Sequence, residues 1–144
     1  MTQPYKGTRR IVRGASLHKV KVPLAHAVTV GNLVFVSGTP PYKTGPNAGY
    51  REMVVGDFGA QFKQSMANMK ASLEAAGSSL DRVVKVSVFL ARGSDFVQMN
   101  ELYRDYWAED DWPARTTLVV GHVVPDMLLE IECVAELDPD KVVK

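Results

Sequence analysis

The sequence is poor in the residues that most often hold metals or carry redox chemistry. It has one cysteine and three histidines in 144 residues. The single Cys133 excludes an internal disulfide, and its place in an alternating apolar strand favours a buried structural thiol over a nucleophile. His18, His26 and His122 are too far apart in sequence for a metal motif, and no histidine or cysteine pair has zinc-ligand spacing. We therefore expect no metal site.

Long apolar runs and several catalytic signatures are missing too. No run approaches the roughly 18 residues of a membrane helix, and the N-terminal residues are basic, without the apolar block of a signal peptide. There is no Gly-x-Ser-x-Gly elbow and no phosphate-binding glycine loop, which argues against hydrolases of that type and against nucleotide enzymes. We expect a cytoplasmic protein with no membrane partner.

Negative charge is absent from the first third of the chain. No aspartate or glutamate precedes Glu52, although the net charge of the whole chain is only +1. Residues 1–22 thus form a basic N-terminal arm. Such an arm could attract RNA or an anionic substrate, but pairing with acidic side chains of its own or a neighbouring subunit is the favoured interpretation. RNA binding remains the alternative.

The rest of the composition is ordinary. With 46% hydrophobic and 23% charged residues, the chain is typical of a globular protein, and its length suits a single domain over residues 1–144. The patterns predict a strand over 32–38, a loop over 39–56, a helix over 57–77, a strand over 84–90, a helix over 94–107, and two terminal strands. Ser94 is expected to cap the second helix, with Phe96 on its inward face. This order predicts an α+β fold in which two helices cover one mixed sheet.

The two terminal strands carry an arginine and a glutamate at corresponding positions. If residues 121–124 form a four-residue turn, Val120 pairs with Pro125, and Arg115 then pairs with Glu130 in an antiparallel hairpin. Their side chains would be near neighbours on one face of the sheet. An ordinary cross-strand ion pair is favoured by composition alone, and an anion-binding site is the alternative.

A further set of segments is shared with a known family. The segments are residues 31–38 (Gly-Asn-Leu-Val-Phe-Val-Ser-Gly), 68–70 (Asn-Met-Lys), 73–77 (Leu-Glu-Ala-Ala-Gly), 84–90 (Val-Lys-Val-Ser-Val-Phe-Leu), 96–103, 113–115 (Pro-Ala-Arg) and 130–132 (Glu-Ile-Glu). In order and spacing, from about residue 23 to the C-terminus, they closely resemble the reactive-intermediate deaminase family, also called Rid or YjgF. The resemblance implies a chorismate-mutase-like α+β fold with a mainly antiparallel sheet, and a homotrimer with clefts between its subunits.

The same resemblance implies an activity. Family members with the arginine hydrolyse 2-imino or enamine acids, such as 2-aminoacrylate, to 2-keto acids and ammonia, without a metal or organic cofactor. Arg115 falls on that arginine and would hold the substrate carboxylate bidentately. Glu130 falls on the acidic residue that would orient or deprotonate the water, and the arginine charge would keep it ionised. Other cleft-lining positions of the family match Asn100, Ser37, Gly38 and Pro125.

Some pocket positions depart from the family pattern. Leu24 stands for a tyrosine, His26 and Thr39 for glutamines, and Thr117 for a cysteine. These changes are compatible with a larger or more apolar imine acid, or with an aminomuconate-like enamine. Two other classes of function stay open: an RNA-directed activity, since some relatives are described as ribonucleases or translation inhibitors, and a protein that binds small carboxylates without turnover.

Overall fold

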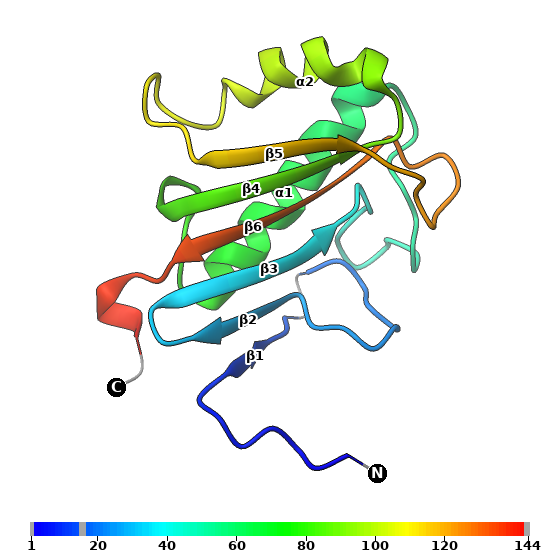
Figure 1. Ribbon diagram of the computed structural model, residues 1–144. Helices are drawn as coiled ribbons and strands as arrows, with labels where there is room; N and C mark the ends of the chain where they lie inside the picture. Colours follow the sequence, from blue (N-terminus) through cyan, green and yellow to red (C-terminus); the bar gives the residue numbers. More distant parts are fainter. Residues whose placement is uncertain (1, 15–16, 143–144) are drawn as a thin grey trace.

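The computed structural model describes residues 2–14 and 17–142, and its centre is a six-stranded sheet (Figure 1). The strands are β1 (Arg10–Val12), β2 (Ala27–Val30), β3 (Leu33–Thr39), β4 (Val83–Leu90), β5 (Ala114–Val119) and β6 (Leu129–Glu136). They lie in the order β1-β2-β3-β6-β4-β5, and every neighbouring pair is antiparallel except β4 and β5. Helices α1 (Phe58–Ala76) and α2 (Phe96–Tyr103) complete the fold. The expected α+β fold of two helices on a mixed sheet is confirmed.

Helix α1 follows directly from its sequence pattern. Asp57 caps it by accepting a 3.0 Å hydrogen bond from the Ala60 amide, and Gly77 ends it in the left-handed conformation at φ 89°. The helix buries its apolar stripe, including Met66 and Met69, against the sheet. Both methionines are fully buried, as expected for residues that fill the core.

Helix α2 differs from its prediction in three respects. It ends at Tyr103, and it is preceded by a 3-10 turn over Gly93–Asp95, so Ser94 does not cap it. The Asp95 carboxylate instead accepts two hydrogen bonds from Arg92, at 2.9 and 3.0 Å. Phe96, which was expected to face inward, is 44% exposed, whereas Met99 of the same helix is buried.

The two faces of the sheet differ sharply. Strand β6 shows the alternation: Leu129, Ile131 and Cys133 are buried, whereas Glu130 and Glu132 project from the opposite face. Burial, followed by the negative charge of Glu132, raises the pKa of the Cys133 thiol to about 12, which fits the predicted structural thiol. In the part of the chain that the structure describes, both helices lie against the first face, and the second is left open (Figure 1).

The predicted hairpin of the terminal strands is wrong. Strand β4 lies between β5 and β6, so Arg115 pairs with Val86 and Glu130 pairs with Phe89. The connection from β4 to β5 passes through α2, which allows the two strands to run parallel. Arg115 and Glu130 are therefore not cross-strand neighbours.

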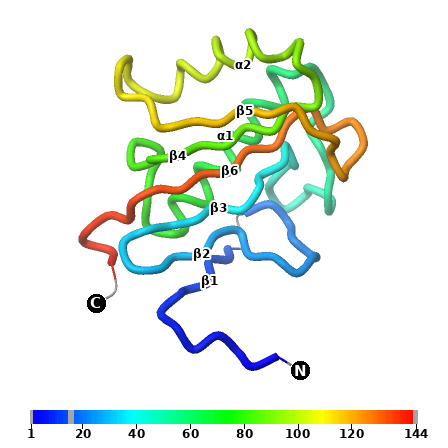
Figure 2. The backbone as a smooth tube through the Cα atoms, in the orientation of Figure 1, coloured from blue at the N-terminus to red at the C-terminus, as the bar shows by residue number. Residues whose placement is uncertain are grey.

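Three loops meet at one end of the sheet. Figure 2 shows residues 17–26, 40–56 and 120–128 gathered there, and residues from all three line a common cavity. None of the helices in residues 2–14 and 17–142 is long and apolar enough to cross a membrane.

Candidate functional site

Arg115 lies on the helix-covered side of β5 and is held by three residues of α2. Its Nη2 donates a 2.7 Å hydrogen bond to Asn100 Oδ1, and its Nη1 lies 3.8 Å from the Met99 sulfur. Its guanidinium carbon lies 4.7 Å from the centre of the Tyr103 ring, a cation–π distance. These contacts fix the orientation of the guanidinium while leaving N–H donors for a ligand.

The surroundings of Arg115 suit an anion. Arg115 makes no ion pair with any acidic side chain of the described residues. The guanidinium borders an open pocket of about 450 Å³, lined by Asn100, Tyr103, Arg104, Trp112, Pro113 and Arg115. A planar, oriented guanidinium without a counterion can bind a carboxylate through two parallel hydrogen bonds.

Glu130 occupies a second cavity, on the open face of the sheet. It is half-buried, and burial, followed by the nearby negative charge of Glu132, raises the pKa of its carboxyl group. Its carboxylate lies over Gly38, where a Cβ atom would collide with Oε1. The cavity has a volume of about 120 Å³ and is lined by His18, Lys19, Val20, Val22, Leu24, Gly38, Pro40, Tyr42, Tyr50, Arg51, Val123, Val124, Met127 and Glu130.

The two ionisable residues predicted to act together thus lie in separate pockets of one chain. Paired residues on neighbouring strands point to the same side, so Arg115 shares the side of buried Val86 and Glu130 shares the side of Phe89. These are opposite faces of the sheet, because Val86 and Phe89 are an odd number of residues apart on β4. The positive charge of Arg115 therefore does not offset the effect of burial on Glu130 within one chain.

The remaining predicted residues divide between the two pockets. Leu24 and Gly38 line the Glu130 cavity, and Asn100 lines the Arg115 pocket. Ser37 has a supporting contact, since its hydroxyl donates a 2.6 Å hydrogen bond to the Ala25 carbonyl. Pro125 is exposed and does not line the Glu130 cavity, although its neighbours in the loop do.

Three of the four substituted positions line neither of these two pockets. Thr117 lies two residues beyond Arg115 on the same strand, and its buried hydroxyl has no hydrogen-bond partner among the described residues. Thr39 is buried and donates a 2.8 Å hydrogen bond to the Ser37 carbonyl. His26 is buried, and its Nε2 lies 2.7 Å from the His18 carbonyl oxygen.

The sequence patterns missed several residues of the Glu130 cavity. Tyr42, Tyr50 and Arg51 belong to the loop between β3 and α1, which has no periodicity that could indicate burial. One signal was available, because the fixed φ angles of the two preceding prolines limit the paths of the chain into Tyr42, and its ring has a large surface to bury. Arg51 itself adopts a left-handed backbone at φ 57°.

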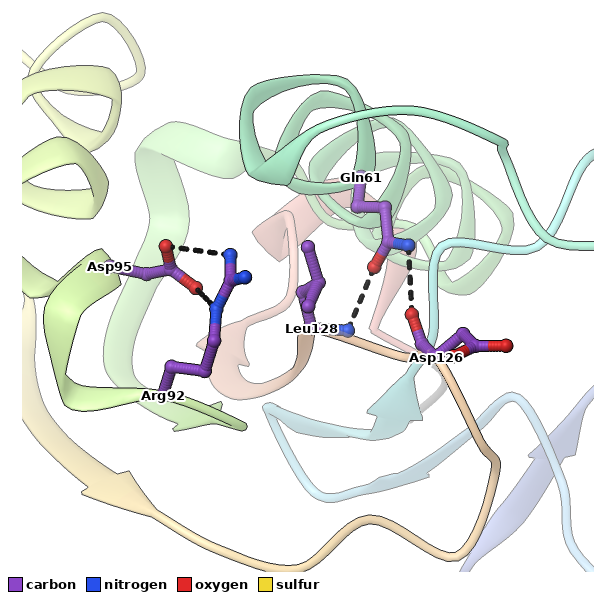
Figure 3. A network of polar contacts seen from close by, with 5 residues as sticks. All are labelled: Gln61, Arg92, Asp95, Asp126 and Leu128. Carbon is purple, nitrogen blue, oxygen red and sulfur yellow. Dashed lines mark hydrogen bonds and ion pairs between the residues drawn. The ribbon is translucent and has the colours of Figure 1, made fainter.

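The loop that closes the Glu130 cavity is tied to α1. Figure 3 shows the Gln61 side chain reaching from the helix to the loop, where it donates to the Asp126 carbonyl at 3.1 Å and accepts from the Leu128 amide at 2.8 Å. Gln61 is only 4% exposed. The nitrogen and the oxygen of its side-chain amide thus both hold this loop, whose residues Val124 and Met127 line the cavity.

Comparison with known proteins identifies the family of this chain. The sequence profile described as endoribonuclease L-PSP matches residues 16–137. The chain is 43% identical to a RutC family protein of Pyrococcus abyssi over 78% of this chain and 85% of that protein. It is 35% identical to the 2-iminobutanoate/2-iminopropanoate deaminase of Escherichia coli, over 78% of this chain and 86% of that enzyme.

A solved structure shows the same arrangement of elements. The yeast protein YEO7 superposes with a TM-score of 0.82 at 34% identity, covering 91% of this chain and all of its own. The match therefore extends over most of the fold of both proteins. The chain belongs to the Rid/YjgF family, whose profile bears the name endoribonuclease L-PSP.

Proposed function

We propose that this protein hydrolyses reactive 2-imino and enamine acids, such as 2-aminoacrylate, to 2-keto acids and ammonia. The observation that carries the proposal is the Arg115 guanidinium, which is oriented by α2, borders an open pocket and has no acidic partner in the described chain. The name of the E. coli relative supports the same reaction class.

In this mechanism Arg115 binds the substrate carboxylate and so places the imine carbon beside a water molecule. Glu130 takes a proton from that water as the water oxygen bonds to the imine carbon, and the same proton then passes from Glu130 to the imine nitrogen. The hydroxyl proton of the resulting carbinolamine moves to the amine nitrogen as the C–N bond breaks, so ammonia leaves and the C=O bond of the keto acid forms. An enamine enters the same route after protonation on carbon. No covalent nucleophile is needed, because the imine is already electrophilic.

The mechanism requires two subunits, since Arg115 and Glu130 face opposite sides of the sheet in one chain. We therefore place the complete site in a homotrimer, where the Arg115 pocket of one subunit meets the Glu130 cavity of its neighbour. The open sheet face supports association, because Phe35 and Leu118 are 45% and 51% exposed there. The approach of the guanidinium across the interface would also oppose the rise in the Glu130 pKa.

The test is hydrolysis of imino acids made in situ by an amino acid oxidase, with keto acid and ammonia measured together. The protein should accelerate both releases, and Arg115→Ala should abolish the acceleration while the elution volume of the assembly stays unchanged. A matched control is Arg82→Ala, because Arg82 lies in the Leu80–Arg82 turn, away from both pockets. Release at the uncatalysed rate across small, apolar and dicarboxylic imino acids would refute the proposal.

Ribonuclease activity is the second candidate, because the family profile is described by that name and the basic arm is exposed at Lys6, Arg9 and Arg10. It predicts RNA binding that weakens steeply with salt and disappears when residues 1–13 are deleted. A carboxylate-binding protein without turnover would instead bind 2-keto acids and release no ammonia.

A further inference from the structure

The Glu130 cavity lacks the tyrosine that the family pattern places at position 24. Leu24 lines the cavity there and offers no polar side-chain atom. Glu130 must nevertheless hold a water in a defined orientation, and a carboxylate alone fixes only the protons of that water. A second polar group from another part of the chain is therefore needed to fix its oxygen.

Tyr42 lines the same cavity and is held rigidly. It is 7% exposed, its backbone carbonyl accepts a 2.8 Å hydrogen bond from Asn68 Nδ2, and it forms an isolated antiparallel bridge with Met53. Its ring packs edge-on against His18, with 6.1 Å between the ring centres. Asn68 is buried on α1, so the tyrosine is attached to the helical layer and to the loop at once.

The Tyr42 hydroxyl also shares the electrostatic surroundings of Glu130. Burial raises the pKa of the Tyr42 phenol, the Arg51 charge lowers it, and the Glu130 and Tyr50 charges raise it. The group is therefore protonated at neutral pH and is available as a donor. No hydrogen bond among the described residues joins it directly to Glu130, and the two side chains line one cavity of about 120 Å³, which is large enough to hold a water molecule.

We propose that Tyr42 is a positioning residue, whose hydroxyl donates a hydrogen bond to the oxygen of the water that Glu130 deprotonates. It takes over from a different loop the polar contact that Leu24 does not provide. This inference rests on the imine hydrolysis proposed above. The water is then held at three points: Glu130 accepts one of its protons, Tyr42 donates to its oxygen, and the remaining lone pair faces the imine carbon.

The test compares Tyr42→Phe, which removes only the hydroxyl, with Tyr106→Phe, which removes a half-buried phenol packed against Phe62 and away from both pockets. Tyr42→Phe should lower kcat by about tenfold, the equivalent of one hydrogen bond, and leave KM nearly unchanged. Tyr106→Phe should leave both constants close to wild type. Adding Leu24→Tyr to Tyr42→Phe should restore a substantial part of kcat.

A second readout does not depend on turnover. With glutamate labelled by ¹³C, the side-chain carbonyl of Glu130 can be titrated by NMR, using Glu130→Gln to assign its signal. In Tyr42→Phe the bound water loses the hydrogen bond that holds its oxygen. The Glu130 pKa should then rise, because a water that donates a hydrogen bond to the carboxylate stabilises its ionised form. Besides Tyr42, the charged or titratable groups that line the cavity with Glu130 are Arg51, Tyr50, His18 and Lys19, and Glu132 lies nearby on the same strand; all are retained in this variant.

The two hypotheses fail in different ways. A wild-type protein that does not hydrolyse imino acids would refute the proposed function, and the Glu130 titration would still decide whether Tyr42 acts on this carboxylate. Normal wild-type turnover with unchanged kcat and an unchanged Glu130 titration in Tyr42→Phe would overturn only the role of Tyr42. A fall in kcat that Leu24→Tyr fails to rescue, with no shift in the titration, would also overturn it.

Discussion

Replacement of Gln61 by alanine should weaken both the fold and the site, because this one side chain joins α1 to the loop over the Glu130 cavity. The substitution removes two hydrogen bonds, at 3.1 Å to Asp126 and 2.8 Å to Leu128. Asp126 is exposed, so water can replace its lost donor, whereas Leu128 is only half-exposed and its amide is harder to hydrate. We therefore expect a loss of about 2 kcal/mol in unfolding free energy, near the cost of one unsatisfied buried group.

The assay is urea unfolding at fixed protomer concentration, since assembly adds a concentration-dependent term to the measured stability. The same loss should lower Tm by roughly 7 °C for a chain of this length. KM should rise as well, because the released loop carries Met127 of the cavity wall. Lys63→Ala is the matched control, as Lys63 is exposed on the same helix. Equal stability and kinetics in the two variants would refute the anchoring role of Gln61.

Two further predictions concern the charges of the site. Asn100→Ala should raise KM by about tenfold, because Arg115 loses the 2.7 Å hydrogen bond that orients it. Asn100→Asp should raise KM further, because the new carboxylate competes with the substrate carboxylate for Arg115. A higher KM for Asn100→Ala than for Asn100→Asp would contradict the role of Arg115 in binding the substrate carboxylate. Glu132→Gln should move the acid limb of kcat/KM to lower pH, since Glu132 helps to raise the Glu130 pKa and activity is lost as pH falls through that pKa. A limb that stays in place or moves to higher pH would show that Glu130 is not the titrating base.

The parts of the fold that the sequence predicted well are those determined by local pattern. Helix α1 has a 3.6-residue apolar period, an aspartate that can cap it and a glycine that can end it, and these signals lie within the helix itself. The start of α2 was predicted less well, because Asp95 bonds to Arg92 and a 3-10 turn precedes the helix. Local chemistry offered Ser94 as an equally good cap.

The pairing of strands depends on contacts that no local pattern contains. The hairpin prediction assumed that the two terminal strands are neighbours, a good rule for consecutive strands but not an obligatory one. Strand β4 separates them, and this places Arg115 and Glu130 on opposite faces. Short β1 and β2 were also missed, because strands of three and four residues carry too few alternations to stand out.

The same difference between local pattern and tertiary packing applies to the residues of the candidate site. Residues such as Arg115 and Asn100 lie on regular elements, and the structure brings them into contact. Tyr42 comes from a loop whose burial depends on tertiary packing against His18 and Asn68. Its place beside Glu130 could not be read from spacing along the chain.

The most direct test of the account is to mix two inactive variants. Arg115→Ala subunits keep Glu130, and Glu130→Gln subunits keep Arg115. A complete site therefore forms wherever the Arg115 pocket of a Glu130→Gln subunit meets the Glu130 cavity of an Arg115→Ala subunit. After joint unfolding and refolding of equal amounts, about a quarter of the clefts in a cyclic trimer should be complete, and imine hydrolysis should return to about that fraction of wild type. Activity that stays at the level of the separate variants would contradict a site shared between subunits.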